Sequence, residues 1–138
     1  MRLYVTATSP YGRIARIVAW EKGFADRIRV VEARTRTPGS PYYETLPSGR
    51  VPYLERDDGP GLEDSALICR YLDMADGHPR LHHPPETGNW AYGRLEATAR
   101  SFLDGLAVHV REMRRPPGER SPTILDHERE RAVRMASQ

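Results

Sequence analysis

The order of predicted elements in the first 32 residues constrains the fold of this chain more than any other feature. Apolar residues alternate with polar or aromatic ones from Leu3 to Ala7, which is typical of a short strand. Ser9 and Pro10 then provide a helix N-cap and a first-turn proline, and apolar residues recur at helical spacing as far as Gly23. The stretch "RIRVVE" (27–32) predicts a second strand. Because a strand–helix–strand unit places its strands parallel with a right-handed crossover, this order predicts an α/β sheet.

Residues 33–75 predict the rest of that sheet. The segment 33–50 is interrupted by prolines and glycines too often for a long regular element. After it, "VPYLE" predicts a strand, "DDGPGL" a tight turn into a short antiparallel strand, and "EDSALICRYLDMA" a helix. The economical fold is a mixed four-stranded sheet with helices on its faces. The apolar faces of the two helices are predicted to be Ile14, Ile17, Val18 and Trp20 in the first, and Leu67, Ile68, Tyr71, Leu72 and Ala75 in the second.

A different pattern begins after Ala75. Residues 76–89 are rich in proline and lack periodicity, which predicts a linker. A long amphipathic helix is predicted from Trp90, and "RRPPGE" ends it. Ser121 and Pro122 then predict the cap and first turn of a highly charged last helix. The apolar stripe of the long helix consists of Leu95, Ala99, Phe102, Leu103, Leu106, Val110 and Met113.

Composition argues against several classes of function. The formal net charge is +2 over 138 residues, spread evenly along both halves, so no nucleic acid partner is expected. The single cysteine, Cys69, excludes an internal disulfide framework and indicates a reducing compartment. No apolar run suits a signal peptide or a membrane span, which favours a cytoplasmic protein with no membrane partner. His78, His82 and His83 lack carboxylate or cysteine neighbours at ligand spacing, so no metal is expected.

Three local motifs lie on the predicted elements in a specific order. "SPYGR" opens the first helix, "SGRVPYL" precedes the third strand, and "LEDSALICRYL" opens the last helix of the sheet. With these motifs the sequence resembles the glutathione S-transferases. The resemblance implies a thioredoxin-like domain (βαβ-ββα) at 1–75, a linker at 76–89, and a truncated all-helical domain at 90–138. Family members run longer, so the chain is expected to be a short form or a fragment.

The resemblance assigns the Ser9 hydroxyl a catalytic role. A free thiol has a pKa of about 8.5, so little of it is ionised at neutral pH. A hydroxyl donor at a helix N-terminus favours the thiolate both by a hydrogen bond and through the helix dipole. Thr8 and Tyr4 are alternative hydroxyls, and without the resemblance Ser9–Pro10 is an ordinary helix cap. Tyr11, in the same motif, is expected to contact the substrate.

The other two motifs are expected to bind the rest of glutathione. The resemblance implies a cis peptide at Val51–Pro52, where the backbone of Val51 pairs with the cysteinyl part of the ligand like an added strand. Asp64 suits the α-amino group of the γ-glutamyl end, and Ser65 with the helix N–H groups suits its carboxylate. The ordinary interpretations are a proline at a strand start and a second helix cap. For the glycyl carboxylate the candidates are Arg50, Arg36 and Arg34, and the sequence does not decide among them.

The implied activity is a glutathione transferase. Glutathione is the co-substrate, no metal takes part, and the thiolate attacks an electrophile that the sequence does not identify, as in detoxification. A homodimer built around residues 90–114 is also implied. The alternative is a non-catalytic glutathione-binding or interaction module of the same fold, and an isomerase or dehalogenase using the same site remains open. The Ser9 hydroxyl favours the transferase, whereas the short helical domain favours the module.

Overall fold

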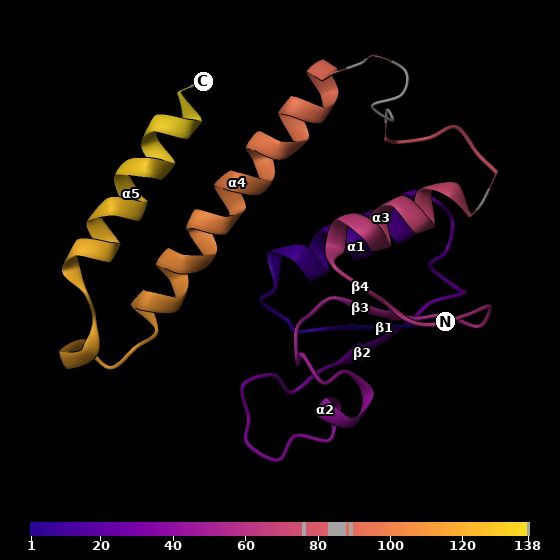
Figure 1. Ribbon diagram of the computed structural model, residues 1–138, viewed down its shortest axis with the longest axis horizontal. Coiled ribbons are helices and arrows are strands. Elements are labelled where there is room, and N and C mark those ends of the chain that lie inside the picture. The colour runs from indigo at the N-terminus through magenta and orange to yellow at the C-terminus, as the bar shows by residue number, and fades with distance from the viewer. Residues whose placement is uncertain (76, 83–87, 89, 138) are drawn as a thin grey trace. The chain divides into compact units, whose positions relative to one another are not determined.

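The computed structural model describes residues 1–75, 77–82, 88 and 90–137 and divides the chain into two units, Met1–His82 and His83–Gln138 (Figure 1). The second unit contains α4 (Trp90–Met113), a 3-10 helix (Pro117–Glu119) and α5 (Pro122–Ala136). The first unit contains β1 (Arg2–Val5), α1 (Pro10–Glu21), β2 (Arg29–Glu32), α2 (Tyr42–Thr45), β3 (Tyr53–Glu55), β4 (Leu62–Glu63) and α3 (Ser65–Met74).

The four strands form one mixed sheet in the order β2-β1-β3-β4. β1 pairs parallel with β2, as a strand–helix–strand unit requires, and β3 pairs antiparallel with both β1 and β4. The predicted thioredoxin-like sheet is confirmed. Its register brings the carboxyl ends of β1, β2 and β4 and the amino end of β3 to one edge. We call this edge, from which residues 6–9, 33–36, 50–52 and 64–65 extend, the loop edge.

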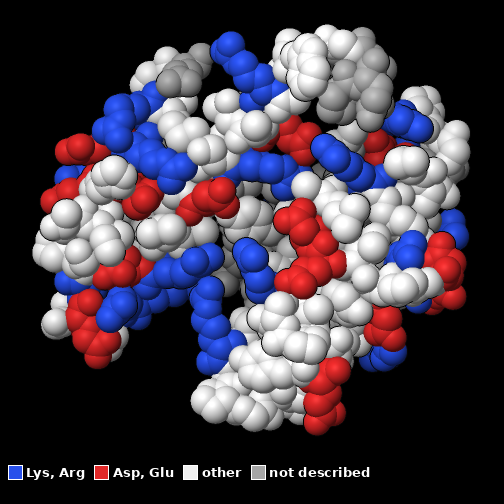
Figure 2. All heavy atoms as spheres, viewed as in Figure 1, with Lys and Arg blue, Asp and Glu red and all other residues white. Residues whose placement is uncertain are grey.

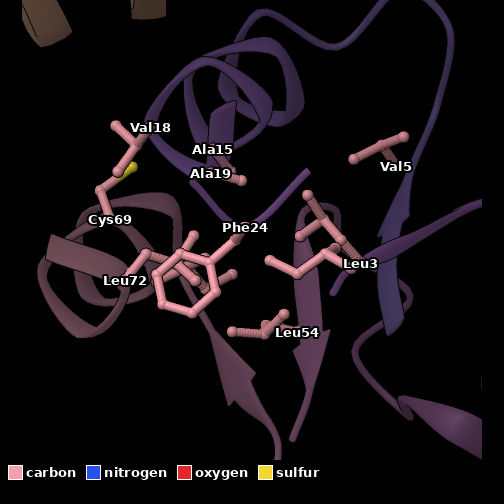
Figure 3. Packing of buried hydrophobic residues seen from close by; sticks show 11 residues of the cluster. Leu3, Val5, Ala15, Val18, Ala19, Phe24, Leu54, Cys69 and Leu72 are labelled. Atoms are coloured by element: carbon pink, nitrogen blue, oxygen red, sulfur yellow. The ribbon is translucent and has the colours of Figure 1, made fainter. Parts of the chain in front are cut away.

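The main core lies between one face of the sheet and the helices α1 and α3. Leu3 and Leu54, on neighbouring strands, point toward Phe24 and Leu72 (Figure 3), and these four side chains are at most 1% exposed. Cys69 lies buried in the same cluster and is not part of a disulfide. The other buried members of the cluster are Val5, Ala15, Val18, Ala19, Ile28 and Ile68.

The helix faces that pack on the sheet agree only in part with those that the apolar periodicity predicts: Val18, Ile68 and Leu72 are buried as predicted, but other members of the predicted faces are exposed. In α1, Ile17 and Trp20 are 53% and 74% exposed, whereas Gly12, Ala15, Val18 and Ala19 are buried. Small side chains let α1 lie close to the sheet: a Cβ on Gly12 would stand 3.0 Å from Val5 Cγ1. In α3, Leu67 is 49% exposed, and Asp73 takes a buried position instead.

A second, smaller cluster covers the opposite face of the sheet. Tyr4 and Tyr53 lie opposite each other on β1 and β3, with ring centroids 6.0 Å apart. Tyr42 and Leu46, from α2 and its C-cap, are buried against this face. The segment 33–50 therefore contains one short helix, which the sequence does not predict, and this helix shields the tyrosines from water.

The second unit is a pair of packed helices joined by polar contacts. Arg131 of α5 donates to the carbonyl oxygen of Ser101 at 2.7 Å and to its hydroxyl at 2.9 Å. The buried carboxylate of Glu112 accepts from the Ser121 N–H at 2.6 Å. Ser121 Oγ in turn accepts from the Ile124 N–H at 3.3 Å, so the predicted cap of α5 is confirmed.

The surface carries charges of both signs. Acidic and basic side chains are interspersed over the face shown in Figure 2. Within residues 1–75, 77–82, 88 and 90–137, no helix is both long and apolar enough to cross a membrane. The same residues contain no group of three histidine, cysteine or acidic side chains placed to hold a metal ion. His83 lies outside the described residues.

Candidate functional site

The loop edge collects every segment for which the sequence predicts a ligand contact. Tyr53, the first residue of β3, lies opposite Tyr4 near the end of β1 and opposite Glu63 at the end of β4. Because β2 runs parallel to β1, its carboxyl end reaches the same edge. The candidate residues placed along this edge are Ser9, Tyr11, Arg34, Arg36, Arg50, Val51, Pro52, Asp64 and Ser65.

Ser9 caps α1 at the loop edge. Its backbone is extended, and its Oγ accepts a hydrogen bond from the Gly12 N–H at 3.1 Å, with Pro10 in the first turn. The predicted helix cap is confirmed. A hydroxyl oxygen that accepts this bond keeps its own proton for donation, and here it does so at the positive end of a 12-residue helix. Ser9 is therefore both a cap and a donor suited to an anion.

Tyr4 offers an alternative hydroxyl for the same anion, but this hydroxyl forms a hydrogen bond toward the other end of the strand. It is 9% exposed, and its hydroxyl donates to Glu55 Oε2 at 3.0 Å. Glu55 lies opposite Arg2, at the start of β1 and away from the loop edge. Burial raises the pKa of Tyr4, and the hydrogen bond to Glu55 raises it further. Of the two alternatives, only Thr8 stays near Ser9.

Val51 offers backbone groups at the start of β3. The predicted cis bond between Val51 and Pro52 is present. Within the described residues, neither the N–H nor the C=O of Val51 makes a backbone hydrogen bond. The preceding peptide is held by side chains instead, because the carbonyl oxygen of Arg50 accepts from the Tyr42 hydroxyl at 2.6 Å. Val51 therefore presents backbone groups without a backbone partner just before β3.

Asp64 and Ser65 form the start of α3. Asp64 Oδ1 accepts from the N–H groups of Ala66 at 2.8 Å and Leu67 at 3.3 Å, so the predicted cap is confirmed. Asp64 has a φ of 81° and a ψ of 126°, a sparsely populated conformation that costs a non-glycine residue about 1–3 kcal/mol. Such residues gather at functional sites, where the strain serves binding. Asp64 is exposed, and Ser65 is buried at the first helical position.

Three arginines supply positive charge along the loop edge. Arg34 and Arg36 follow β2, Arg50 precedes Val51, and all three are exposed. Within the described part of the chain, none of their side chains makes an ion pair or hydrogen bond, so each is available to an anionic ligand. The structure does not select one of them. Tyr11 lies half-buried in the first turn of α1.

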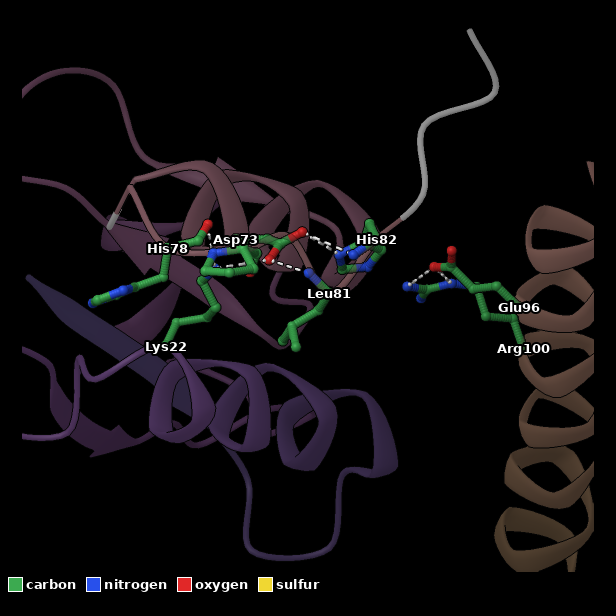
Figure 4. A network of polar contacts seen from close by, with 8 residues as sticks. Lys22, Asp73, His78, Leu81, His82, Glu96 and Arg100 are labelled. Carbon is green, nitrogen blue, oxygen red and sulfur yellow. Dashed lines mark hydrogen bonds and ion pairs between the residues drawn. The ribbon is translucent and has the colours of Figure 1, made fainter. Parts of the chain in front are cut away.

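Lys22 and Asp73 form a buried ion pair that the sequence analysis does not predict. Their side chains are 2% and 1% exposed, and Lys22 Nζ lies 3.2 Å from Asp73 Oδ1 (Figure 4). Lys22 also donates to the carbonyl oxygens of Pro79 at 2.9 Å and His78 at 3.4 Å. The feature of the sequence that could have drawn attention to Lys22 is that it is the only lysine in an arginine-rich chain.

The carboxylate of Asp73 also accepts hydrogen bonds from residues 81–82. It accepts from the N–H groups of Leu81 at 2.7 Å and His82 at 2.9 Å, and its Oδ2 lies 3.1 Å from His82 Nδ1. The ion pair therefore ties residues 78–82 to the ends of α1 and α3. The His78 carbonyl oxygen binds Lys22 and the His82 ring contacts Asp73, so both residues contribute to this structural network.

Comparison with known proteins agrees with this geometry. Residues 8–75 match the model of the glutathione S-transferase N-terminal domain. A protein of Escherichia coli described as the uncharacterized GST-like protein YibF is 27% identical over 134 residues, which is 97% of this chain and 65% of that protein. Glutathione S-transferase 2 of Saccharomyces cerevisiae is 33% identical over 84 residues, 59% of this chain and 36% of that protein. The chain thus spans less than two thirds of either relative.

Solved structures show the same relationship. A glutathione S-transferase of Methylobacillus flagellatus, crystallised with GSH bound, has a TM-score of 0.83 at 31% identity. The match covers 97% of this chain and 65% of the Methylobacillus chain. A glutathione transferase family member of Pseudomonas fluorescens, with bound glutathione, has a TM-score of 0.83 at 26% identity, over 99% of this chain and 68% of that one. From its matched domain, relatives and fold, this chain belongs to the glutathione S-transferase family.

Proposed function

We propose that this protein is a glutathione transferase, in which residues 1–75 bind glutathione and activate its thiol for attack on a small electrophile. The observation that carries the proposal is the convergence, at the loop edge, of the hydroxyl cap at Ser9, the unpaired backbone of Val51 and the acidic cap at Asp64. Glutathione bound in similar structures supports it. Conjugation of this kind serves detoxification, and a cysteine outside any disulfide, Cys69, suits the reducing cytoplasm.

The chemistry requires a thiolate. The glutathione thiol releases its proton to solvent, the sulfur forms a bond to the electrophilic carbon, and the leaving group departs with the bonding electron pair. Ser9 donates a hydrogen bond to the anionic sulfur, and the N-terminal end of α1 adds positive potential. Both contacts favour the charged form, so they lower the pKa of the bound thiol toward neutrality.

The remaining parts of glutathione meet groups of matching chemistry. The N–H and C=O of Val51 pair with the cysteinyl residue as an added strand. The Asp64 carboxylate attracts the α-ammonium group, and the N–H groups around Ser65 receive the α-carboxylate. The glycyl carboxylate is neutralised by an arginine of the loop edge. The other proposed contacts are Tyr11, Arg36, Arg50 and Pro52.

Calorimetry tests the binding site. Glutathione is expected to bind at millimolar concentration or below, and Asp64→Asn is expected to weaken binding about ten- to a hundredfold through loss of a charged hydrogen bond. Asparagine has nearly the same shape as aspartate and still caps a helix, so the variant removes mainly the charge. Asp26→Asn, at an exposed carboxylate between α1 and β2, is the matched control and should bind as the unsubstituted chain does. No heat at millimolar glutathione would contradict the proposal.

A non-catalytic glutathione-binding module is the second candidate. The contact between the Ser9 Oγ and the Gly12 N–H favours it, because this contact explains Ser9 as a helix cap without any catalytic role. Turnover separates the two candidates. A transferase conjugates glutathione to a generic aryl halide faster than the uncatalysed reaction, whereas a module binds glutathione without accelerating it.

We also propose a homodimer formed through residues 90–114. Large apolar side chains on α4 are exposed to water, including Trp90 at 71% and Leu95 at 67%. Burying each would contribute about 1.5–3 kcal/mol, and a contiguous exposed patch normally marks an interface. Light scattering on a size-exclusion column should give about twice the 15.7 kDa chain mass. Leu95→Glu should yield monomers and Val133→Glu, on α5, should not; a monomeric unsubstituted chain at micromolar concentration would overturn the proposal.

A further inference from the structure

The Tyr42 hydroxyl is held against the backbone that precedes Val51. Tyr42 is the first residue of α2, is 7% exposed, and has its ring centroid 5.5 Å from that of Tyr4. Its hydroxyl donates to the carbonyl oxygen of Arg50 at 2.6 Å. Burial, and then the charge of Glu63, raise the pKa of Tyr42 well above its usual value, so the hydroxyl stays a neutral donor at physiological pH.

The carbonyl that Tyr42 holds belongs to the same peptide group as the Val51 N–H. In a trans peptide group the C=O and the N–H lie in one plane and point in opposite directions. A hydrogen bond that fixes the Arg50 oxygen toward Tyr42 therefore turns the Val51 N–H away from Tyr42. The same bond polarises the peptide group and makes its N–H a stronger donor.

Arg50 is also held on its amino side. Its N–H donates to Ser48 Oγ at 3.3 Å, and the Ser48 hydroxyl donates to Glu63 Oε1 at 2.6 Å. Glu63 is the last residue of β4 and precedes Asp64. The peptide group in front of Val51 is thus fastened to α2 through its oxygen. The peptide group before that one is tied to β4 through Ser48, so Arg50 is held from both sides by elements of the sheet domain.

We propose that Tyr42 is a positioning residue for glutathione, which directs the Val51 N–H toward the cysteinyl carbonyl of the ligand. The inference rests on the proposed glutathione site and adds a residue that acts through the backbone. The adjacent Tyr43 provides a matched control. Its hydroxyl accepts from the Thr37 N–H at 3.1 Å, so it secures the same loop at a different point.

The test is calorimetric titration of glutathione into the full chain and its Tyr42→Phe and Tyr43→Phe variants. Phenylalanine keeps the ring packing and removes the hydroxyl. Tyr42→Phe should raise the Kd for glutathione about five- to tenfold, the effect of one hydrogen bond, with the pKa of the bound thiol unchanged. Tyr43→Phe should bind as the unsubstituted chain does. Thermal unfolding of both variants checks that they are equally folded.

A glutathione analogue separates positioning from a general structural role. When the cysteinyl carbonyl is reduced to a methylene, the Val51 N–H has no acceptor, so Tyr42→Phe and the unsubstituted chain should bind the analogue equally. A five- to tenfold loss with the analogue as well would assign Tyr42 to folding alone and overturn the inference. Equal affinity for glutathione itself would overturn it while leaving the proposed function intact. Absence of glutathione binding by the unsubstituted chain would overturn the proposed function and this inference with it.

Discussion

Replacing Asp73 with alanine is expected to lower the free energy of unfolding of the Met1–His82 unit by about 3–5 kcal/mol, because it leaves the buried ammonium of Lys22 without its counter-ion. The N–H groups of Leu81 and His82 lose their acceptor in the same variant. Urea unfolding followed by circular dichroism measures the change. Lys22→Met should have a loss of similar size, because it leaves the buried Asp73 carboxylate without the Lys22 ammonium.

Two further variants show whether the cost comes from burial of an unpaired charge. Glu130→Ala breaks an exposed ion pair with Arg134 in α5 and should change the free energy of unfolding by less than about 1 kcal/mol. The double variant Lys22→Met/Asp73→Leu removes both charges and should be more stable than either single variant. A loss below about 1 kcal/mol for Asp73→Ala would show that the pair does not hold residues 78–82 in solution.

The same ion pair makes stability depend on pH. Burial alone would raise the pKa of Asp73, but the N–H groups of Leu81 and His82, the His82 ring and the Lys22 ammonium together lower it from 3.8 to about 2. A carboxyl with a lowered folded-state pKa stabilises the fold above its unfolded value and loses that stabilisation as pH falls. About 2 kcal/mol should therefore disappear between pH 4 and pH 2. Asp73→Asn should lack this component, whereas an equal pH dependence in both proteins would contradict the assignment.

Ser9→Ala is expected to reduce the rate of conjugation about ten- to a hundredfold, because a hydrogen bond to a charged group contributes about 1.5–3 kcal/mol. The pKa of the bound glutathione thiol should rise by the amount that corresponds to this free energy, whereas the Kd for glutathione should change little. Thiolate absorbance against pH measures the pKa, and steady-state kinetics measures the rate. An unchanged thiol pKa with full activity would transfer the role to Thr8 or to the backbone N–H groups of α1.

The cap that Ser9 provides requires its own control, because Ser9→Ala also removes the bond to the Gly12 N–H. Ser121 has the same arrangement at the start of α5, with proline at the next position and its Oγ accepting from the Ile124 N–H. Ser121→Ala should lose a comparable amount of stability, about 1 kcal/mol, without moving the thiol pKa. A shift of the thiol pKa in both variants would mean that it reports helix stability instead of a hydrogen bond to sulfur.

The sequence alone predicts the features of this protein that depend on neighbouring residues. The caps at Ser9, Asp64 and Ser121 follow from side chains that bond to N–H groups two or three positions away. The strand–helix–strand order predicts the parallel pair β1–β2, and the tight turn before Leu62 predicts the antiparallel pair β3–β4. The thioredoxin-like arrangement of the sheet is what the resemblance to the family implies. Three motifs along the chain were also sufficient to suggest the family and the residues at the loop edge.

Contacts between distant segments were decided only by the tertiary structure. Periodicity favoured Ile17 and Trp20 for the core, but the close approach of α1 to the sheet admits only small side chains at that face, and helical spacing does not report that distance. The pairing of Lys22 with Asp73 and the bond from Tyr42 to Arg50 likewise leave no local pattern. Lys22 meets Asp73 because α1 packs against α3, and Tyr42 meets Arg50 because the segment 33–50 folds back before β3. Only the fold therefore places each donor beside its acceptor.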